Sequence, residues 1–371
     1  MKYIIIIFST LLTSCLQPSS HKKEAANGKQ SAETPMFQPK NYVCYRTESP
    51  LTIDGKLDER AWQNAPWTDD FLDIEGEVKE KPKHRTHVKM LWDDHYFYVA
   101  AELEDPHIWA TLTQRDAVIF YDNDFEVFLD PNGDTHGYYE YEVNALNTVW
   151  DLLLLKPYRE GGPAITNWDI KNLKSAVHIN GTINDPSDID QKWTVEIAFP
   201  HKVLNELNQN HGAKHGRQWR VNFSRVQWQS THVDGVYKKT INPETGKSYR
   251  EDNWVWSPQG AIDMHRPERW GMVQFSDVIA GKGTDEFIYN LDEDVKWELY
   301  NLYYAQRAYY KNNRHYTTQL SKLNHTGISS FTFNPVVKTT QSLFEARASR
   351  KESAFIWHID QSGRTWKSKK H

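Results

Sequence analysis

Four carboxylates and an asparagine alternate with other residues along two neighbouring stretches of the sequence, 124–129 (DFEVFL) and 138–144 (YYEYEVN). Side chains of a β-strand point alternately to opposite faces, so every second residue shares a face. The intervening positions carry aromatic and aliphatic residues, and 130–134 (DPNGD) has the composition of a turn. The pattern predicts a hairpin with one apolar face and one acidic face. The acidic face carries Asp124, Glu126, Glu140, Glu142 and Asn144.

Like charges that face each other across a hairpin destabilise it, so this acidic face needs compensation. Water, a nearby Arg or Lys, or a bound cation could each supply it. Clustered carboxylate and amide oxygens suit both a hard cation such as calcium and the hydroxyl groups of a sugar. A solvated outer face, a polar-ligand site and a calcium cage therefore all remain open. Phe120 and Tyr121, directly upstream, favour a ligand site because their rings could serve as a stacking platform.

The same residue types allow two further kinds of chemistry. A glycoside hydrolase needs a carboxylic acid and a carboxylate on either side of the bond that breaks, and the four carboxylates could supply such a pair. Asp130, Asn132 and Asp134 have the spacing of oxygen ligands in calcium loops, although Gly133 and Thr135 depart from the EF-hand pattern. That segment is compatible with a hairpin turn or a calcium site. The sequence contains no G-x-S-x-G, H-E-x-x-H or phosphate-binding glycine loop.

The composition indicates a β-rich protein. The chain has 371 residues and a formal charge of −5, so its overall charge does not favour binding to nucleic acid. It contains 15 Trp, 19 Tyr and 15 Phe although its mean hydropathy is −0.75. Aromatic residues interleaved with Asp, Asn and Gly are typical of β-rich folds, and they suit ligands that offer flat faces to aromatic rings.

The N-terminus has the pattern of a bacterial lipoprotein signal. Lys2 is followed by an apolar run over 4–12, which is too short to span a bilayer but has the length of a signal-peptide core. Small residues precede Cys15 as in a lipobox, so we expect a signal peptide over 1–14 and a lipid on Cys15. An ordinary secretory signal is the alternative. Residues 15–41 are then a disordered tether, and the protein is expected in the bacterial cell envelope, at the outer membrane.

Residues 42–277 contain many short alternating stretches, spaced at roughly ten residues, and almost no long helical pattern. This predicts a single domain built as an antiparallel β-sandwich. With Cys15 modified by lipid, Cys44 is the one free cysteine left, so no intramolecular disulfide is expected.

The composition changes after 281–283, and residues 284–371 are expected to form a separate C-terminal piece. Apolar and aromatic residues near helical spacing predict one long helix over 295–323, with a break near Asn312 and Asn313. The aromatic residues of this helix are expected to pack on the sandwich. Short strands and a basic tail follow; the strands are predicted over 331–337, 342–348 and 354–359.

Seven motifs occur in an order that resembles a known family. They are IDGKLDERAW, VKMLWDDHYFYVAAELEDP, DFEVFLDP, YEYEVN, WTVEIAFP, WRVNFSR and WSP…RPERWGMVQF. Their succession is similar to that of carbohydrate-binding module family 9, within the DOMON-like β-sandwich class, on a lipoprotein of Bacteroidetes type. The resemblance covers residues 42–277 and implies a mainly β fold, an antiparallel sandwich; the long helix and small β-sheet at the C-terminus lie outside it.

The resemblance also implies a sugar site on the acidic face. Sugar-binding members of the family clamp a sugar between two tryptophans, hydrogen-bond its hydroxyls through Glu, Arg and Asn, and hold structural calcium. By position, the Glu is Glu126, the Asn is Asn144 and the first clamp residue is Phe120 in this sequence. Two positions depart from the pattern: Glu142 stands where the family has Arg, and Met264 stands where it has the second Trp.

Other residues complete the expected site. Arg225, on the WRVNFSR strand, could supply the missing positive charge or could be a buried structural residue paired with Glu126 or Glu142. The wall opposite the stacking platform is expected from Met264, His265 and Trp256.

The expected function is non-catalytic binding of a poly- or oligosaccharide by a lipid-anchored protein, in support of glycan capture or catabolism beside glycan-degrading enzymes. Calcium is the expected structural ion. The alternatives are a glycan hydrolase that uses the four carboxylates, a structural envelope domain without a ligand, and a haem-binding domain. Related sandwich domains bind haem through Met and His, but Met264 and His265 are adjacent in sequence and are not expected to reach opposite faces of one haem.

Overall fold

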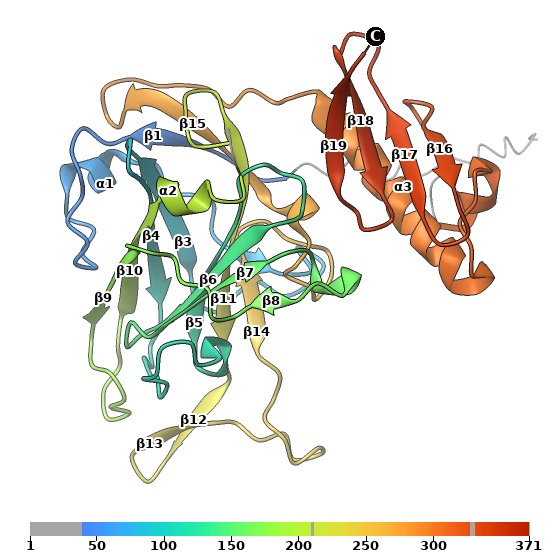
Figure 1. Ribbon diagram of the computed structural model, residues 1–371. Coiled ribbons are helices and arrows are strands. Elements are labelled where there is room, and N and C mark those ends of the chain that lie inside the picture. The colour runs from blue at the N-terminus through green and yellow to red at the C-terminus, as the bar shows by residue number, and fades with distance from the viewer. Residues whose placement is uncertain (1–38, 209–210, 327–330, 371) are drawn as a thin grey trace, which may run out of the picture. The chain divides into compact units, whose positions relative to one another are not determined.

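The computed structural model describes residues 39–208, 211–326 and 331–370 (Figure 1). The signal peptide predicted over 1–14, the lipid site at Cys15 and tether residues 15–38 lie outside the described residues. Among the helices in the described part of the chain, none combines the length and the apolar character needed to cross a membrane.

The N-terminal part of the described chain is built almost entirely from strands. In chain order they are β1 (Asn41–Arg46), β2 (Leu72–Asp73), β3 (Thr86–Trp92), β4 (Tyr96–Glu104), β5 (Asp124–Asp130), β6 (Tyr138–Asn144), β7 (Val149–Leu154), β8 (Ala164–Ile165), β9 (Lys174–Asn180), β10 (Lys192–Pro200), β11 (Gln218–Gln227), β12 (Ser230–Val233), β13 (Val236–Lys239), β14 (Asp252–Val255) and β15 (Gly271–Ile279). The helices are α1 (Arg60–Asn64), α2 (His201–Leu204) and the 3-10 turns η1 (Ile119–Tyr121), η2 (Tyr158–Glu160) and η3 (Pro267–Arg269).

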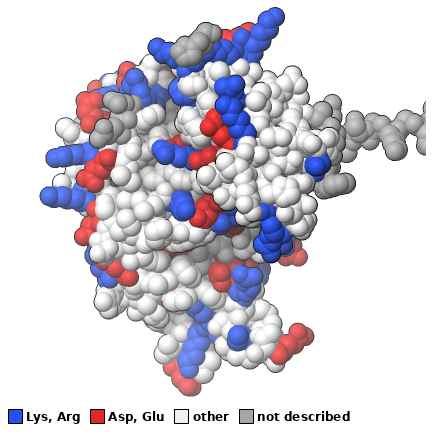
Figure 2. All heavy atoms as spheres, turned by 45° about the vertical axis from the view of Figure 1, so that its right-hand side comes forward, with Lys and Arg blue, Asp and Glu red and all other residues white. Residues whose placement is uncertain are grey.

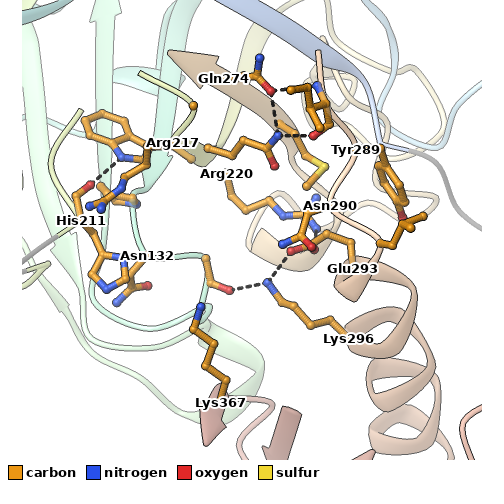
Figure 3. Close-up of a pocket in the computed structure, with 18 of the residues that line it drawn as sticks. Asn132, His211, Arg217, Arg220, Gln274, Tyr289, Asn290, Glu293, Lys296 and Lys367 are labelled. Carbon is orange, nitrogen blue, oxygen red and sulfur yellow. Dashed lines mark hydrogen bonds and ion pairs between the residues drawn. The ribbon is translucent and has the colours of Figure 1, made fainter. Parts of the chain in front are cut away.

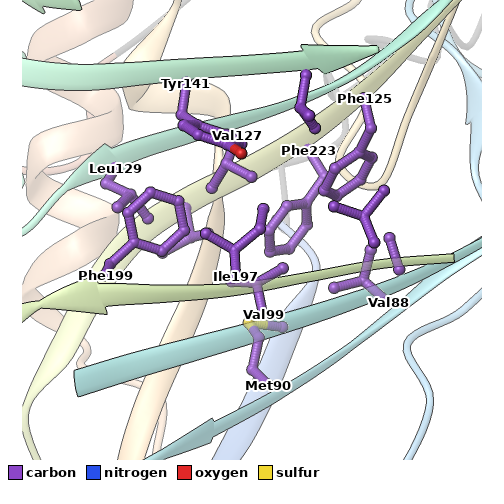
Figure 4. Packing of buried hydrophobic residues seen from close by; sticks show 14 of the residues in the cluster. Val88, Met90, Val99, Phe125, Val127, Leu129, Tyr141, Ile197, Phe199 and Phe223 are labelled. Atoms are coloured by element: carbon purple, nitrogen blue, oxygen red, sulfur yellow. The ribbon is translucent and has the colours of Figure 1, made fainter. Parts of the chain in front are cut away.

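Thirteen of these strands form one hydrogen-bonded sheet in the order β8-β7-β6-β5-β11-β15-β1-β3-β4-β10-β9, with β14 and β2 branching from β11, and β12 and β13 form a separate two-stranded sheet. Neighbours are antiparallel except at β1, which pairs in parallel with β15 and with β3. The path closes over a core, so that β5, β6 and β11 face β3, β4 and β10 across apolar side chains (Figure 4). The predicted β-sandwich is therefore confirmed, with one parallel strand.

The predicted hairpin is β5 and β6, and its apolar face lies in this core. Phe125, Val127 and Leu129 of β5 are buried beside Tyr141 of β6 and Phe223 of β11 (Figure 4). Each such side chain stabilises the fold by about 1.5–3 kcal/mol relative to an exposed one. Because the alternation is strict, burial of this face also determines the direction of the acidic face.

The IDGKLDERAW segment is held to the sandwich by one buried carboxylate. Glu196 of β10 accepts hydrogen bonds from the Trp62 indole (2.8 Å) and from the backbone N–H groups of Asp54 and Gly55 (3.0 and 3.1 Å). Gly55 has φ +83°, and a Cβ there would lie 2.7 Å from the Val177 carbonyl carbon. Only glycine fits this close approach.

The C-terminal piece contains α3 (Asp292–Asn313), η4 (Leu320–Thr326) and a sheet of four strands. The helix ends where Arg314 takes a left-handed conformation (φ 59°), close to the predicted break. The predicted basic tail is instead partly a fourth strand. The strands are β16 (Val336–Thr339), β17 (Phe344–Ala348), β18 (Phe355–Asp360) and β19 (Thr365–Lys369).

The apolar stripe of α3 packs on its own sheet, so the prediction that the aromatic residues of this helix pack on the sandwich is correct only for some of them. Leu299, Leu302 and Tyr303 lie in one cluster with Phe344 and Ile359 of the small sheet. Contacts from α3 to the sandwich are of two kinds. Arg269 lies over the Trp297 ring and Arg266 over the Tyr304 ring. Hydrogen bonds or ion pairs join Tyr304 to Glu268, Arg307 to Glu160, and Glu293 to Arg220.

Candidate functional site

The acidic face of the β5–β6 hairpin is buried, so a solvated outer face is excluded. Glu126 lies directly opposite Glu142, and Asp124 lies directly opposite Asn144. Asp124, Glu126 and Glu142 each place one carboxylate oxygen within 4.8 Å of the others. Glu140 lies one pair further along the same face, opposite Phe128. These four carboxylates are between 0% and 5% exposed.

A cavity of about 200 Å³ opens over this face. Its floor is formed by β5 and β6, and its walls by η1, η2, strands β7 and β14, and the loop that carries Met264. The residues around it are Phe120, Glu126, Phe128, Glu140, Glu142, Trp150, Tyr158, Val226, Glu251, Asn253, Met264 and His265. Five residues of the predicted site, from segments up to 145 positions apart, are therefore brought together: Phe120, Glu126, Glu142, Met264 and His265.

Burial and mutual repulsion make these carboxyls hard to ionise. Burial is the main cause that raises the pKa of Glu126 from 4.5 to about 7. The pKa values of Asp124, Glu140 and Glu142 lie well above their ordinary values for the same reason, with further contributions from neighbouring carboxylates. All four shifts therefore have the same direction.

Two of the buried carboxylate oxygens have no hydrogen-bond donor. Asp124 Oδ2 and Glu140 Oε2 are unpartnered. The other oxygen of Asp124 accepts only the Val226 N–H at 3.3 Å, and Glu142 Oε2 accepts the Phe120 N–H at 3.1 Å. A buried polar atom without a partner is costly, so these two oxygens call for an explanation.

Aromatic rings border the mouth of the cavity. Phe120 and Tyr121 lie with their ring centroids 5.0 Å apart, and Tyr121 is 56% exposed. The Trp228 indole donates to the Phe120 carbonyl (2.8 Å) and so fixes η1. Phe120 can therefore act as the cavity-lining part of the predicted stacking platform, whereas Tyr121 lies beside it and is not among the residues that line the cavity.

Trp150 and Tyr158 also line the cavity and were not predicted as site residues. Trp150 of β7 lies directly opposite Glu142, and its indole N–H is buried without an acceptor. Its place could have been inferred, because alternation along β7 brings it to the acidic face. Tyr158 belongs to η2 and follows a turn, and no periodic pattern there predicts the direction of its side chain.

His265 forms one wall as a neutral side chain. Its Nδ1 lies 2.8 Å from the Tyr138 hydroxyl, and its Nε2 lies 4.0 Å from Glu140 Oε2. Burial, with a smaller contribution from the positive charge of Arg159, lowers the pKa of His265 to about 3. His265 therefore does not neutralise Glu140 at physiological pH.

Arg225 and Trp256 do not belong to the site, contrary to the prediction. Arg225 shares the core side of β11 with Phe223, and its guanidinium lies 3.2 Å from Asp105 and donates to the Glu104 carbonyl at 2.8 Å. It pairs with neither Glu126 nor Glu142. Trp256 is 1% exposed and packs in the core of the sandwich. For Arg225 the physical reason is the alternation of side chains along a strand: residues 221, 223 and 225 of β11 all point to the core side.

Asn144 lies on the acidic face but its amide is occupied by local structure. It donates to the Leu112 carbonyl (2.8 Å) and to Asp122 (3.0 Å), and it accepts from the N–H groups of Leu146 and Thr148. Asn144 therefore holds the turn after β6, and it is absent from the residues that line the cavity.

The segment 130–134 is a turn, as one of its two interpretations predicted. Asp130 accepts hydrogen bonds from the N–H groups of Gly133 and Thr135, and Asn132 accepts one from Asp134. Asp134 accepts from the His136 N–H and from the Arg364 guanidinium. These oxygens stabilise the turn, so the geometry does not favour Asp130, Asn132 and Asp134 as calcium ligands.

A larger cavity of about 710 Å³ lies between the sandwich and α3 (Figure 3). Glu293 is within 2.5 Å of Arg220 and 3.2 Å of Lys296, and Lys296 also donates to the Gly133 carbonyl. This network joins α3 to β11 and to the 130–134 turn. Elsewhere, Figure 2 shows positive and negative side chains interspersed over the visible face.

Comparison with known proteins identifies the family of the sandwich. The family model described as "Carbohydrate family 9 binding domain-like" matches residues 53–277. "Endo-1,4-beta-xylanase C" of Paenibacillus barcinonensis is 33% identical over 101 residues, and "Exoglucanase XynX" of Acetivibrio thermocellus is 34% identical over 157 residues. These matches span 26% and 42% of this chain but only 8% and 12% of the two enzymes.

Among solved structures, a carbohydrate-binding module family 9 from Caldicellulosiruptor kristjanssonii in complex with cellotriose is 14% identical. It covers 67% of this chain and 100% of its own, with a TM-score of 0.40. The family match spans more than half of the chain, and it includes every strand of the sandwich except β1 and the last two residues of β15. The chain therefore belongs to the carbohydrate family 9 binding domain-like family, as the succession of sequence motifs indicated.

Proposed function

We propose that this protein binds a poly- or oligosaccharide without transforming it, in the cavity over the acidic face of β5 and β6. The main support for the proposal is that aromatic rings and buried carboxylates line the same open cavity, in a sandwich of this family. Rings stack on the apolar faces of sugars, and carboxylates accept hydrogen bonds from sugar hydroxyls. Phe120 supplies a ring in the cavity and Tyr121 a ring beside it, and Glu126 and Glu142 supply the acceptors.

The size of the cavity favours one end or one short section of a glycan. Its volume of about 200 Å³ is below the roughly 300–1,000 Å³ of pockets that enclose a drug-sized ligand. One sugar ring can therefore enter while the rest of the chain extends past Tyr121. Xylan- and glucan-type oligosaccharides are the first to test, because the matched segments occur in an endo-1,4-β-xylanase and an exoglucanase.

The geometry favours binding over hydrolysis. A glycosidase places its acid and its base or nucleophile on opposite sides of the scissile bond, and their surroundings push the two pKa values apart. Here the carboxylate oxygens of Asp124, Glu126 and Glu142 lie together within 4.8 Å on one face of the β5–β6 hairpin. Their pKa values are all raised. Within this cluster, no carboxyl is set apart as the general acid from another that acts as base or nucleophile.

We further propose that Cys15 carries a lipid that anchors the protein in the bacterial envelope, where it retains glycans for degrading enzymes. The lipobox-like sequence before Cys15 supports this. Labelling of growing cells with a palmitate analogue tests it, with Cys15→Ser as the control. Loss of label in the variant is expected, and label that persists would refute lipidation at Cys15.

The binding proposal is tested by a glycan array followed by calorimetry on the full chain. We expect saturable binding to at least one plant-type oligosaccharide and at least tenfold weaker binding for Phe120→Ala. Trp366→Ala, which removes a ring that is 37% exposed in the C-terminal sheet, is the matched control and should bind as the parent does. Equal affinities of Phe120→Ala and the parent would place the ligand elsewhere. No binding to any glycan would refute the function.

A further inference from the structure

We infer that Asp124, Glu126 and Glu142 bind a divalent cation of the calcium class, and that this cation takes part in holding the sugar. The inference rests on the proposed function and adds a metal site to it. It starts from geometry: three buried carboxylates from two paired strands place one oxygen each within 4.8 Å of one another. That spacing suits ligands of a shared calcium ion, which takes oxygen ligands at about 2.3–2.6 Å.

The second observation is the unpartnered oxygen of Asp124. This side chain is fully buried, yet Oδ2 has no donor, while Oδ1 has only one long hydrogen bond, from Val226. A carboxylate is not left in this state without a large desolvation cost. A cation between Asp124, Glu126 and Glu142 would supply the missing partner directly.

The surrounding side chains do not supply this positive charge. Arg225 of the adjacent strand pairs with Asp105 on the core side, and Arg159, which contacts His265, pairs with Glu268. His265 lies nearest to Glu140 and is neutral. The neighbouring charges that act most strongly on Asp124 and Glu142 are other carboxylates. Compensation must therefore come from protons or from a bound cation.

The environment also explains how a sugar would contact the ion. Calcium prefers six to eight oxygen ligands, and three carboxylates leave several coordination positions open. These carboxylates border the cavity at Glu126 and Glu142, beneath Phe120. Two adjacent hydroxyls of a sugar ring stacked on Phe120 could then fill two of the open positions. Three negative charges also exceed the charge of one divalent cation, so the filled site would retain one negative charge.

The first experiment measures metal binding without sugar. The full chain is treated with EDTA, exchanged into metal-free buffer at pH 7.5, and titrated with calcium by calorimetry and with terbium by luminescence, which Trp150 and Tyr158 can sensitise. We expect one site per chain. Asp124→Asn and Glu142→Gln should weaken it at least tenfold, whereas Glu352→Gln, an exposed carboxylate of the C-terminal piece, should not. Unchanged calcium binding in both trio variants, or none in the parent, would overturn the inference.

The second experiment measures sugar binding with and without EDTA. We expect at least tenfold weaker binding in EDTA, restored by calcium. Glu142→Arg should bind sugar equally well with and without calcium, because it supplies a positive charge covalently. Thermal unfolding of each variant shows that it is folded. Sugar binding that is identical in EDTA would overturn the metal inference and leave the proposed function intact, whereas metal binding without binding of any glycan would refute the proposed function alone.

Discussion

Replacing Glu126 by Gln should stabilise the metal-free protein at high pH and have little effect at low pH. Glu126 is 5% exposed, and burial raises its pKa from 4.5 to about 7. A carboxyl whose pKa is higher in the folded state binds more protons folded than unfolded between these two values. Stability therefore falls as the pH rises through this range.

The magnitude follows from the same two pKa values. One pKa unit corresponds to about 1.4 kcal/mol, so a rise from 4.5 to about 7 costs about 3 kcal/mol of folding free energy above pH 8. Below pH 4.5 the carboxyl is protonated in both states and this cost is absent. Gln has nearly the same shape and carries no charge, so Glu126→Gln should gain about 3 kcal/mol at pH 8 and about 0 at pH 4.5.

Urea unfolding in EDTA at pH 4.5, 6 and 8 measures this difference. Glu196, a buried acid outside this cluster, titrates in the same range but contributes equally to the parent and the variant. The neighbouring carboxyls, whose pKa values the Glu126 charge raises, add to the same pH-dependent difference. Glu352→Gln, whose carboxylate is 70% exposed, is the matched control and should change stability by less than about 0.5 kcal/mol at each pH. A difference between parent and Glu126→Gln that does not vary with pH would refute the reasoning.

Three further predictions concern the frame of the site. Glu293→Ala should destabilise the protein by about 3–5 kcal/mol, because it leaves the buried charges of Arg220 and Lys296 unpaired. Chemical denaturation measures this loss, and Glu48→Ala is an exposed control that should cost under about 1 kcal/mol. Equal losses of stability in the two variants would contradict the prediction. Gly55→Ala should cost at least about 1–3 kcal/mol, because φ is +83° and a Cβ would meet the backbone at Val177; a thermal midpoint equal to that of the parent would refute this. Trp150→Ala should weaken sugar binding by about 0.5–1.5 kcal/mol through loss of an aromatic contact, measured by calorimetry, and unchanged affinity would exclude Trp150 from the site.

The hairpin at the centre of the site could be predicted because its alternation is local. Phe125, Val127 and Leu129 lie on the same face of β5 and are buried in the core, so Asp124 and Glu126 must point to the opposite face. The same rule would have placed Arg225 with Phe223 on the core side, so its assignment to the site neglected information that the sequence contains. The alternation of side chains along β7 likewise predicts that Trp150 lies beside Glu142.

Other features depend on contacts between distant segments and could not be read from spacing. The acidic face is enclosed by Tyr158 after β7 and by Met264 and His265 before β15, and no local pattern indicates that these turns reach it. For this reason, the sequence alone does not distinguish a solvated acidic face from a buried one. The aromatic stripe of α3 indicated a buried face, but the sequence does not state which sheet covers it.

A crystal structure of the protein with its best-binding oligosaccharide and calcium tests the central claim most directly. We predict a sugar ring stacked on Phe120, with hydroxyl groups directed at Glu126 and Glu142 and a cation between these carboxylates and Asp124. A sugar bound instead in the larger cavity near Arg220 and Lys296 would contradict the assignment of the binding site.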